Sequence, residues 1–331
     1  MQTEFLDNFA HRAKQQPQTI VLPEGTDPRI LEAAAHCARQ GLARPIVLGI
    51  SDEINAICKT QDIDPDGITI VDPCRNEQSA SYAELLYKLR KAKGMTMEQA
   101  STLITQPIVF ANCMVRAGDA DGCVAGAQHA TSDVVRAALQ IIGVAPGVKL
   151  VSSFFIMVLS DACASPVVFA DCALNIAPNA EQLADIATSS AQSAAQLLGF
   201  DPKIAMLSFS TNASAAHPEV DKVRNATALV KERHPSLQVI GDIQFDAAFS
   251  AKTLTGKWPE PDFDAPANVF VFPSLEAGNI GYKIAERLGG ALPIGPVLQG
   301  LNQPVNDLSR GCDVAAVINT IIVTAVQSQQ R

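Results

Sequence analysis

Polar residues that could bind an anion stand in three places directly before an apolar, helix-like pattern. The C-terminal example is the most informative, because Ser309, Arg310 and Gly311 precede a predicted helix over 313–328 with Asp313 as its N-cap. Apolar residues recur in this segment at the i, i+3, i+4 and i+7 spacing of an amphipathic helix. Helix-terminal amides, the helix dipole and a guanidinium together suit phosphate, so Ser309 and Arg310 are predicted to bind an anion.

The hydroxyl of Ser309 could alternatively be a nucleophile. No G-x-S-x-G elbow surrounds this serine, and no histidine stands near it in the sequence. Both observations favour a hydrogen-bond donor to an anion or oxyanion. A histidine brought close by the fold would restore the nucleophile as an alternative.

The second place is AGAQHATSDVVR, residues 125–136, where a predicted strand leads into a predicted helix. Thr131 or Ser132 is expected to cap this helix, and His129 lies in the same turn. Arg136 lies early in the helix, where a cation opposes the helix dipole and an anionic ligand would relieve the conflict. A solvated arginine and a structural histidine are the alternatives.

The third place is EGTDPR, which follows the first predicted strand. Asp27 is a predicted N-cap and Pro28 suits the first helical position, so Arg29 either belongs to a helix start or binds an anion. Arg90 belongs to a different arrangement. With three nearby lysines it ends a predicted helix, where basic residues are favoured with or without a ligand.

Short β-branched runs alternate with helical patterns along the chain, which predicts mainly parallel sheets flanked by helices. Strands are expected at 19–23, 45–49, 68–72, 122–126, 149–158, 166–171, 203–209, 237–241 and 268–273. Helices are expected at 28–40, 77–91, 133–142, 180–198, 218–233, 277–288 and 313–328, after a short amphipathic helix at the start of the chain.

Two breaks suggest two domains. One is GVAPGVK at 143–149, and the other is the Pro- and Gly-rich segment at 289–300. If both are hinges, the last helix returns to the first domain. The predicted division is therefore 1–145 with 300–331 as one domain and 146–299 as the other.

Composition narrows the class of protein. The 331 residues carry a formal net charge of −9 without any run of five or more basic residues, which argues against a nucleic-acid partner. Eight scattered cysteines without a C-x-x-C pair, Cys163 among them, argue against a zinc site and favour a reducing compartment. The chain start lacks the apolar core of a signal peptide, and no apolar stretch is long enough for a membrane. A cytoplasmic protein without a membrane partner is expected.

Seven segments, in this order, resemble the phosphate acetyl/butyryl transferase family: VLPEGTDPRILEAA, LRKAKGMT, GCVAGAQHATSDVVRAALQI, MLSFST, IQFDAA, NVFVFPSLEAGNIGYKIAERL and GPVLQGLNQPVNDLSRGC. The resemblance implies an acyltransferase that moves an acetyl group between acetyl phosphate and coenzyme A. It also implies two α/β domains of the isocitrate/isopropylmalate dehydrogenase type with the site in the cleft between them. A homodimer, formed through the second domain, is implied as well, with no metal and no permanently bound cofactor.

The resemblance also implies roles for single residues. Ser309 and Arg310 match the serine and arginine of N-D-L-S-R-G, which hold the substrate and the tetrahedral transition state. Substrate-binding positions of the family are matched by Arg90, His129, Thr131 and Arg136. The transfer itself is expected to proceed by direct attack of the thiolate in a ternary complex, with a covalent acetyl-enzyme as the rival mechanism.

One position departs from the family pattern. The family usually has an acidic residue seven positions after the serine, as a base for the thiol, and this chain has Ala316 there. We hypothesise that Asp313 substitutes as base or thiol-orienting group, against the simpler interpretation that it only caps the helix. Butyryl specificity and a low-activity sensor are the alternative functions. A metal-dependent dehydrogenase is disfavoured, because Asp242 and Asp246 are the only tempting acidic pair.

Overall fold

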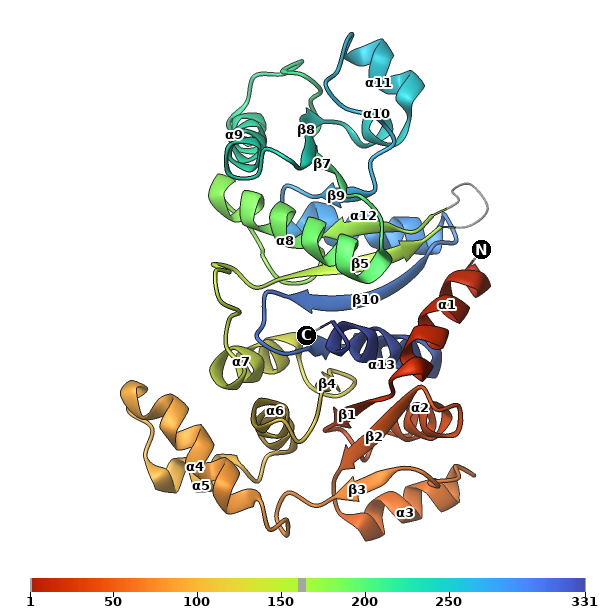
Figure 1. The fold of residues 1–331 in the computed structure, drawn as a ribbon, viewed down its shortest axis with the longest axis vertical. Coiled ribbons are helices and arrows are strands. Elements are labelled where there is room, and N and C mark those ends of the chain that lie inside the picture. The colour runs from red at the N-terminus through yellow and green to blue at the C-terminus, as the bar shows by residue number, and fades with distance from the viewer. Residues whose placement is uncertain (1, 160–164, 331) are drawn as a thin grey trace. The chain divides into compact units, whose positions relative to one another are not determined.

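The structure of the chain is a computed structural model that describes residues 2–159 and 165–330 (Figure 1). Cys163 lies outside these residues, and the seven cysteines that are described are free thiols. No helix in the described chain combines the length and apolar character that crossing a membrane requires.

The chain divides into two compact units. The terminal unit comprises Leu6–Pro146 and Leu301–Arg331, and the central unit comprises Gly147–Gly300 together with the residues up to Phe5. The first residues join the central unit because the side-chain amide of Gln2 donates to the carbonyls of Val158 and Gly290, at 3.1 Å each. A functional division into domains, and dimerisation through 146–299, stay predictions.

The terminal unit is built on a five-stranded parallel sheet with the strand order β11-β4-β1-β2-β3. The strands are β1 (Gln18–Leu22), β2 (Ala43–Leu48), β3 (Thr69–Val71), β4 (Gly122–Ala125) and β11 (Val305–Asp307). The helices are α1 (Gln2–Gln15), which begins in the other unit, α2 (Pro28–Arg39), α3 (Ser51–Thr60), α4 (Ser79–Arg90), η1 (Lys91–Lys93), α5 (Met97–Leu103), α6 (Pro107–Ala117), α7 (Thr131–Ile141) and α13 (Val314–Ser328).

The parallel pairing of β1, β4 and β11 places three loops at one edge of this sheet. Parallel strands end on the same side, where open α/β sheets bind ligands. The loop after β1 carries Glu24 and Asp27, the loop after β4 carries His129, and the loop after β11 carries Ser309 and Arg310. The candidate site is therefore assembled from loops that are far apart in sequence.

The central unit has a six-stranded sheet with the order β10-β5-β6-β9-β7-β8. The pairings of β5 with β10 and with β6 are antiparallel, and the other pairings are parallel. The strands are β5 (Ser152–Val158), β6 (Val167–Ala170), β7 (Lys203–Leu207), β8 (Gln238–Ile243), β9 (Val269–Val271) and β10 (Leu292–Gln299). The helices are α8 (Ala180–Leu198), α9 (Pro218–Arg233), α10 (Phe245–Phe249), α11 (Ala251–Lys257) and α12 (Leu275–Arg287).

The nine predicted strands and seven predicted helices all appear, with shifted ends. The segment 289–300, predicted as a break, instead contains the edge strand β10. Its register with β5 shifts between Ile294 and Val297, around Gly295 and Pro296. A proline and an irregularity are tolerated at a sheet edge, because the outer side of the strand needs no partner.

Candidate active site

The loop from β11 to α13 presents its polar groups to solvent. Ser309, Arg310 and Gly311 are exposed, and the Ser309 hydroxyl accepts a hydrogen bond from the amide of Gly311 at 3.3 Å. Asp313 is the N-cap of α13, as predicted, because its carboxylate accepts from the amide of Ala316 at 2.8 Å. A serine and a guanidinium thus stand just before a helix N-terminus, where an anion is stabilised.

Arg29 holds this loop in place. Its guanidinium donates to the carboxylate of Asp27 through Nε and Nη2, at 3.0 and 2.7 Å. The other donors reach the carbonyls of Ala127 at 3.0 Å, Arg310 at 2.9 Å and Cys312 at 2.9 Å. All five N–H groups of the arginine are therefore used by the protein itself. The interpretation of Arg29 as an anion ligand is wrong, because the side chain joins three loops instead.

Glu24 organises the loop after β4. Its buried carboxylate accepts from the backbone amides of Gly126, Ala127, Gln128 and His129, at 2.8 to 3.1 Å. Burial opposes ionisation, but the hydrogen bonds from His129 and from these amides outweigh it and lower the pKa of Glu24. Successive amides that converge in this way form an anion-binding concavity, and here a side chain of the protein occupies it.

The imidazole of His129 completes the set of donors to Glu24. The ring Nδ1 lies 2.8 Å from the carboxylate, and the side chain is 31% exposed. An ionised carboxylate only accepts, so Nδ1 carries the hydrogen and Nε2 of the neutral ring has a free lone pair. The hydrogen bond to Glu24 raises the pKa of His129, while partial burial opposes the rise.

Thr131 and Asp307 join the same loop to β11. The threonine hydroxyl donates to Asp307 Oδ2 at 2.5 Å, so it does not cap α7 as predicted, and Ala130 is the N-cap residue. Asp307 is 1% exposed, and burial raises its pKa to about 6. Its Oδ1 has no hydrogen-bond partner among the described residues. A Cβ at Gly126, where φ is +113°, would lie 2.3 Å from this oxygen, so the close approach requires glycine.

The two other predicted arginines lie on neighbouring helices. Arg136 is exposed on α7 and pairs with Asp133 at 2.8 Å. It is the sixth of the eleven residues of α7 and lies beyond the first turn, so the predicted conflict with the helix dipole is small. Arg90 ends α4, which packs against α7. No hydrogen bond or ion pair joins either arginine to the loop of Ser309 in the described residues.

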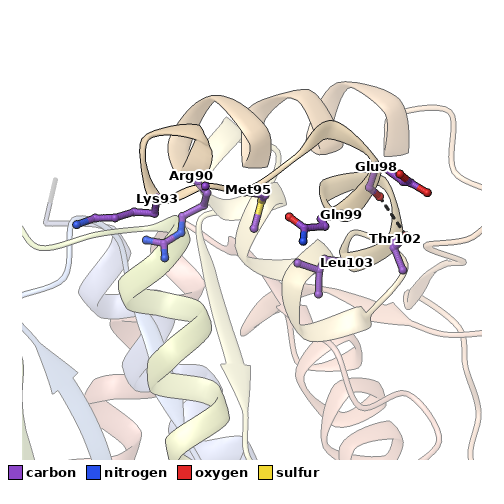
Figure 2. Close-up of a pocket in the computed structure, with 8 residues that line it drawn as sticks. Arg90, Lys93, Met95, Glu98, Gln99, Thr102 and Leu103 are labelled. Atoms are coloured by element: carbon purple, nitrogen blue, oxygen red, sulfur yellow. Dashed lines mark hydrogen bonds between the residues drawn. The ribbon is translucent and has the colours of Figure 1, made fainter.

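A cavity of about 670 Å³ lies beside Arg90 in the terminal unit. Figure 2 shows Arg90 and Lys93 together at one end, Met95 near the middle, and Glu98 with Thr102 at the other end. Gly94, Gln99 and Leu103 complete the lining. The cavity therefore offers two cations beside apolar and amide groups.

The acidic pair considered for a metal is engaged elsewhere in the central unit. Asp246 pairs with Lys257 at 2.6 Å, and Asp242 accepts from the amide of Ala213 at 3.2 Å. Within residues 2–159 and 165–330, no group of three or more His, Cys, Asp or Glu side chains could hold a metal ion.

Residues 4–325 match the model of one family, described as phosphate acetyl/butaryl transferase. The chain belongs to this family. A phosphate acetyltransferase of Thermoanaerobacterium thermosaccharolyticum is 46% identical over 98% of this chain and 99% of its own. The crystal structure of a phosphotransacetylase from Streptococcus pyogenes is 42% identical, with a TM-score of 0.93 over 99% of each chain. The predicted family is therefore confirmed.

The fold class is confirmed as well. Besides the phosphotransacetylase of Streptococcus pyogenes, a candidate 4-hydroxythreonine-4-phosphate dehydrogenase from Salmonella typhimurium superimposes with a TM-score of 0.52 at 13% identity, over 95% of this chain. At this identity the likeness concerns the fold alone, which is an α/β fold of the dehydrogenase type. What sequence reasoning missed is Glu24 and the bridging role of Arg29, since the backbone groups that they bind in the loops after β4 and β11 lie about a hundred or more residues away.

Proposed function

We propose that the protein is a phosphate acetyltransferase, an acyltransferase that moves an acetyl group reversibly between acetyl phosphate and coenzyme A in acetate metabolism. The observation that carries the proposal is the 46% identity, over nearly the full length of both chains, to a relative of that name. The loop of Ser309 and Arg310 supports it, because a guanidinium and a hydroxyl beside a helix N-terminus suit a phosphoryl group.

In this proposal the catalytic residues are Ser309, Arg310 and Asp313. Arg310 and Arg136 hold the phosphoryl oxygens, which are charged before and after transfer. Ser309 donates to the carbonyl oxygen, which becomes more negative in the transition state. Direct attack by the thiolate in a ternary complex then gains most of its acceleration from the positioning of two bound substrates.

The proposed substrate-binding residues include Arg90, His129 and Thr131. Arg90 and Lys93 lie at one end of the cavity, where two cations suit the phosphates of coenzyme A. Thr131 contributes indirectly, because its hydroxyl holds the turn of His129 to Asp307. Coenzyme A is needed as a co-substrate, and no permanently bound cofactor is required.

Asp313 has two proposed roles, as base or as thiol-orienting group. Its carboxylate already accepts from the amide of Ala316, and its side chain is exposed at the start of α13. A capping carboxylate still has a second oxygen that can accept a proton or a hydrogen bond. Both roles are compatible with the cap.

Thioester formation from acetyl phosphate and coenzyme A tests the proposal. We expect turnover by the wild-type protein and a loss of about 10²- to 10³-fold in kcat/KM for Arg310→Gln. Arg75→Gln is the matched control, since this arginine is 88% exposed in another part of the terminal unit. Absence of thioester formation by the wild-type protein would contradict the proposal.

A second candidate function is motivated by Ala316. Without an acid at this position the protein could bind acetyl phosphate or acyl-coenzyme A as a sensor without efficient turnover, or prefer a butyryl group. Calorimetry and the reverse assay, in which phosphate releases coenzyme A from acetyl- or butyryl-coenzyme A, distinguish these cases. Binding without turnover indicates a sensor, and a higher kcat/KM with butyryl-coenzyme A indicates butyryl specificity.

A cytoplasmic homodimer is also part of the proposal. Ile280 and Ile284 on α12 and Leu288 directly after it follow the i, i+4, i+8 spacing of one helix face, and they are 59%, 53% and 85% exposed. A second copy that covers this row would remove apolar surface from water. Sedimentation of the wild-type protein and of Ile284→Asp tests this, and a monomeric wild-type protein would contradict it.

A further inference from the structure

Acetyl transfer to a thiol requires a proton acceptor. A thiol with a pKa of about 8.5 is only a few per cent ionised near neutral pH. Side chains in the loops that surround Ser309 and Arg310 could accept this proton. Four carboxylates and one imidazole lie in or next to these loops: Glu24, Asp27, Asp307, Asp313 and His129. Both oxygens of Asp27 are already bound by the guanidinium of Arg29.

The buried carboxylates of this set are poorly suited. Glu24 has a fully buried side chain, and its two oxygens already accept from four amides and an imidazole. Asp307 is 1% exposed, and its partnerless Oδ1 is enclosed against Gly126. A thiol cannot reach either carboxylate without displacing the loop after β4.

His129 is accessible and oriented. Its Nδ1–H donates to Glu24, so the neutral ring directs its free lone pair away from Glu24 at Nε2, and no partner of Nε2 is present in the described residues. The side chain is 31% exposed. The backbone amide of the same residue also donates to Glu24, so main chain and ring are held by one carboxylate.

The turn of His129 adjoins the loop of Ser309. β4 and β11 are neighbouring parallel strands, and the amide of Leu308 donates to the carbonyl of Ala125 at 2.7 Å. Arg29 then bridges the carbonyls of Ala127 and Arg310. The imidazole and the proposed anion-binding residues are therefore parts of one hydrogen-bonded assembly.

We propose that His129 Nε2 accepts the thiol proton of coenzyme A and that Glu24 is the positioning residue that orients the ring. This inference rests on the proposed function and names the base of that site. Asp313 then keeps the capping and thiol-orienting role. A buried carboxylate that holds a histidine in one tautomer, with the other ring nitrogen free, is the arrangement used by general bases.

The proton and electron balance of the step is complete. The S–H proton moves to Nε2 as the sulfur forms a bond to the acetyl carbon, and the C–O bond to phosphate breaks with its electron pair on the phosphate oxygen. The imidazolium formed is stabilised by Glu24. His129 then returns the proton to the departing phosphate, which leaves as hydrogen phosphate, so no other reactant is needed.

Several charged groups act on the pair of His129 and Glu24, called the dyad below. His129 faces Glu24 from the loop after β1 and Asp133 from α7, and both raise its pKa. Glu24 in turn interacts with Arg29 of α2, Asp307 of β11, and the thiols of Cys123 and Cys312. Because the two carboxylates closest to the ring favour its charged form, the base becomes available only as pH rises.

The test compares a thiol with a selenol. Coenzyme A whose sulfur is replaced by selenium is already ionised at neutral pH and needs no base. We expect His129→Gln to lose about 10²- to 10⁴-fold in kcat with coenzyme A and less than about tenfold with the selenol. Equal losses with both nucleophiles would overturn the dyad, because His129 would then only bind or support the site.

Glu24→Gln provides a second readout. It removes the charge that raises the pKa of His129, so the rise of kcat with pH should move to lower pH. Thermal unfolding checks that both variants fold. An unshifted pH profile in folded Glu24→Gln overturns the dyad alone, whereas a wild-type protein that forms no thioester overturns the proposed function together with it.

Discussion

Each unit of the molecule contains a buried carboxylate that several backbone amides surround. In the terminal unit Glu24 accepts from the amides of residues 126–129. In the central unit Asp171, which is 2% exposed, accepts from the amides of Ala173, Leu174 and Asn175. Both carboxylates thus neutralise converging N–H dipoles in the same way.

The two carboxylates differ in their remaining donors. Asp171 receives the hydroxyl of Ser153 and the side-chain amide of Asn175, neither of which titrates near neutral pH. Glu24 receives the ring of His129, which is partly exposed and does titrate there. A buried carboxylate in a nest of amides is therefore no sign of a site by itself. The titratable donor at its edge distinguishes the site from a purely structural turn.

The largest effects should come from truncation of the two carboxylates. Glu24→Ala leaves four amides without their acceptor and Asp171→Ala leaves three, and a stranded buried group costs about 1 to 3 kcal/mol. We expect both variants to lose several kcal/mol in the free energy of unfolding. Glu24→Ala should also lose about 10³-fold in turnover per folded molecule, because His129 loses its positioning residue.

Turnover of Asp171→Ala is the control for this comparison. The folded fraction, measured by circular dichroism, should retain activity within about fivefold, since the carboxylate supports only its own turn and Ser153 of β5. If folded Asp171→Ala loses as much activity as Glu24→Ala, it is wrong to regard Asp171 as purely structural and Glu24 as part of the site.

Asp307 extends the comparison of Glu24 with Asp171, because it is a third buried carboxylate. Its Oδ1 has no hydrogen-bond partner among the described residues. Burial raises its pKa from 3.8 to about 6, so the folded protein holds the proton more tightly than the unfolded chain. This contribution is complete below about pH 4 and is lost as pH rises through 6, with a size of about 3 kcal/mol. The wild-type protein should lose this stability between pH 4 and 7, whereas Asp307→Asn should not.

The measurement is the pH dependence of the melting temperature. Thr131→Val is the companion variant, because it removes the hydroxyl that lowers the pKa of Asp307. Its stability loss should move to higher pH. Parallel pH profiles for wild type and Asp307→Asn would show that Asp307 is not the group whose titration changes the stability.

Local signals in the sequence predicted part of this site, and long-range contacts form the rest. The N-cap Asp313 was predictable because its partner lies three residues away, and the loop of Ser309 followed from the helix pattern after it. The hydrogen bonds of Glu24 span more than a hundred residues, so no window of the sequence contains both ends. Thr131 has a good capping side chain, yet its hydroxyl donates to Asp307 at the end of strand β11.

The difference between local signals and long-range contacts also explains which strands could be predicted. β-branched runs with helical patterns between them identified nine strands, because their periodicity is local. The strand β10 was missed because Gly295 and Pro296 interrupt its pattern, and only the pairing with β5 reveals it. Tertiary pairing therefore overrides the local signal at a sheet edge.

Substitution of Arg29 should have a smaller effect on activity than Glu24→Ala. Lysine has three donors on a flexible stem, so Arg29→Lys cannot bind five acceptors, and the loops of Ala127 and Arg310 should loosen. We expect a loss of about 10- to 50-fold in kcat/KM for acetyl phosphate. The control in the central unit is Arg224→Lys, where the arginine is 53% exposed and 3.9 Å from Asp242, and less than about twofold change is expected. Equal losses in both variants would contradict the bridging role.

The smallest effect should come from Asp313, which separates the two candidate bases. Asparagine caps a helix as well as aspartate does, so Asp313→Asn should keep the stability of α13, and Asp313→Ala should lose about 1 kcal/mol. If Asp313 only orients the thiol, Asp313→Asn should reduce kcat about two- to fivefold and leave the shape of its pH profile unchanged. A loss above about 10²-fold that is largest at low pH would assign the proton to Asp313. The surroundings of Glu24 would then resemble those of Asp171, because the imidazole of His129 would hold the loop and take no part in the chemistry.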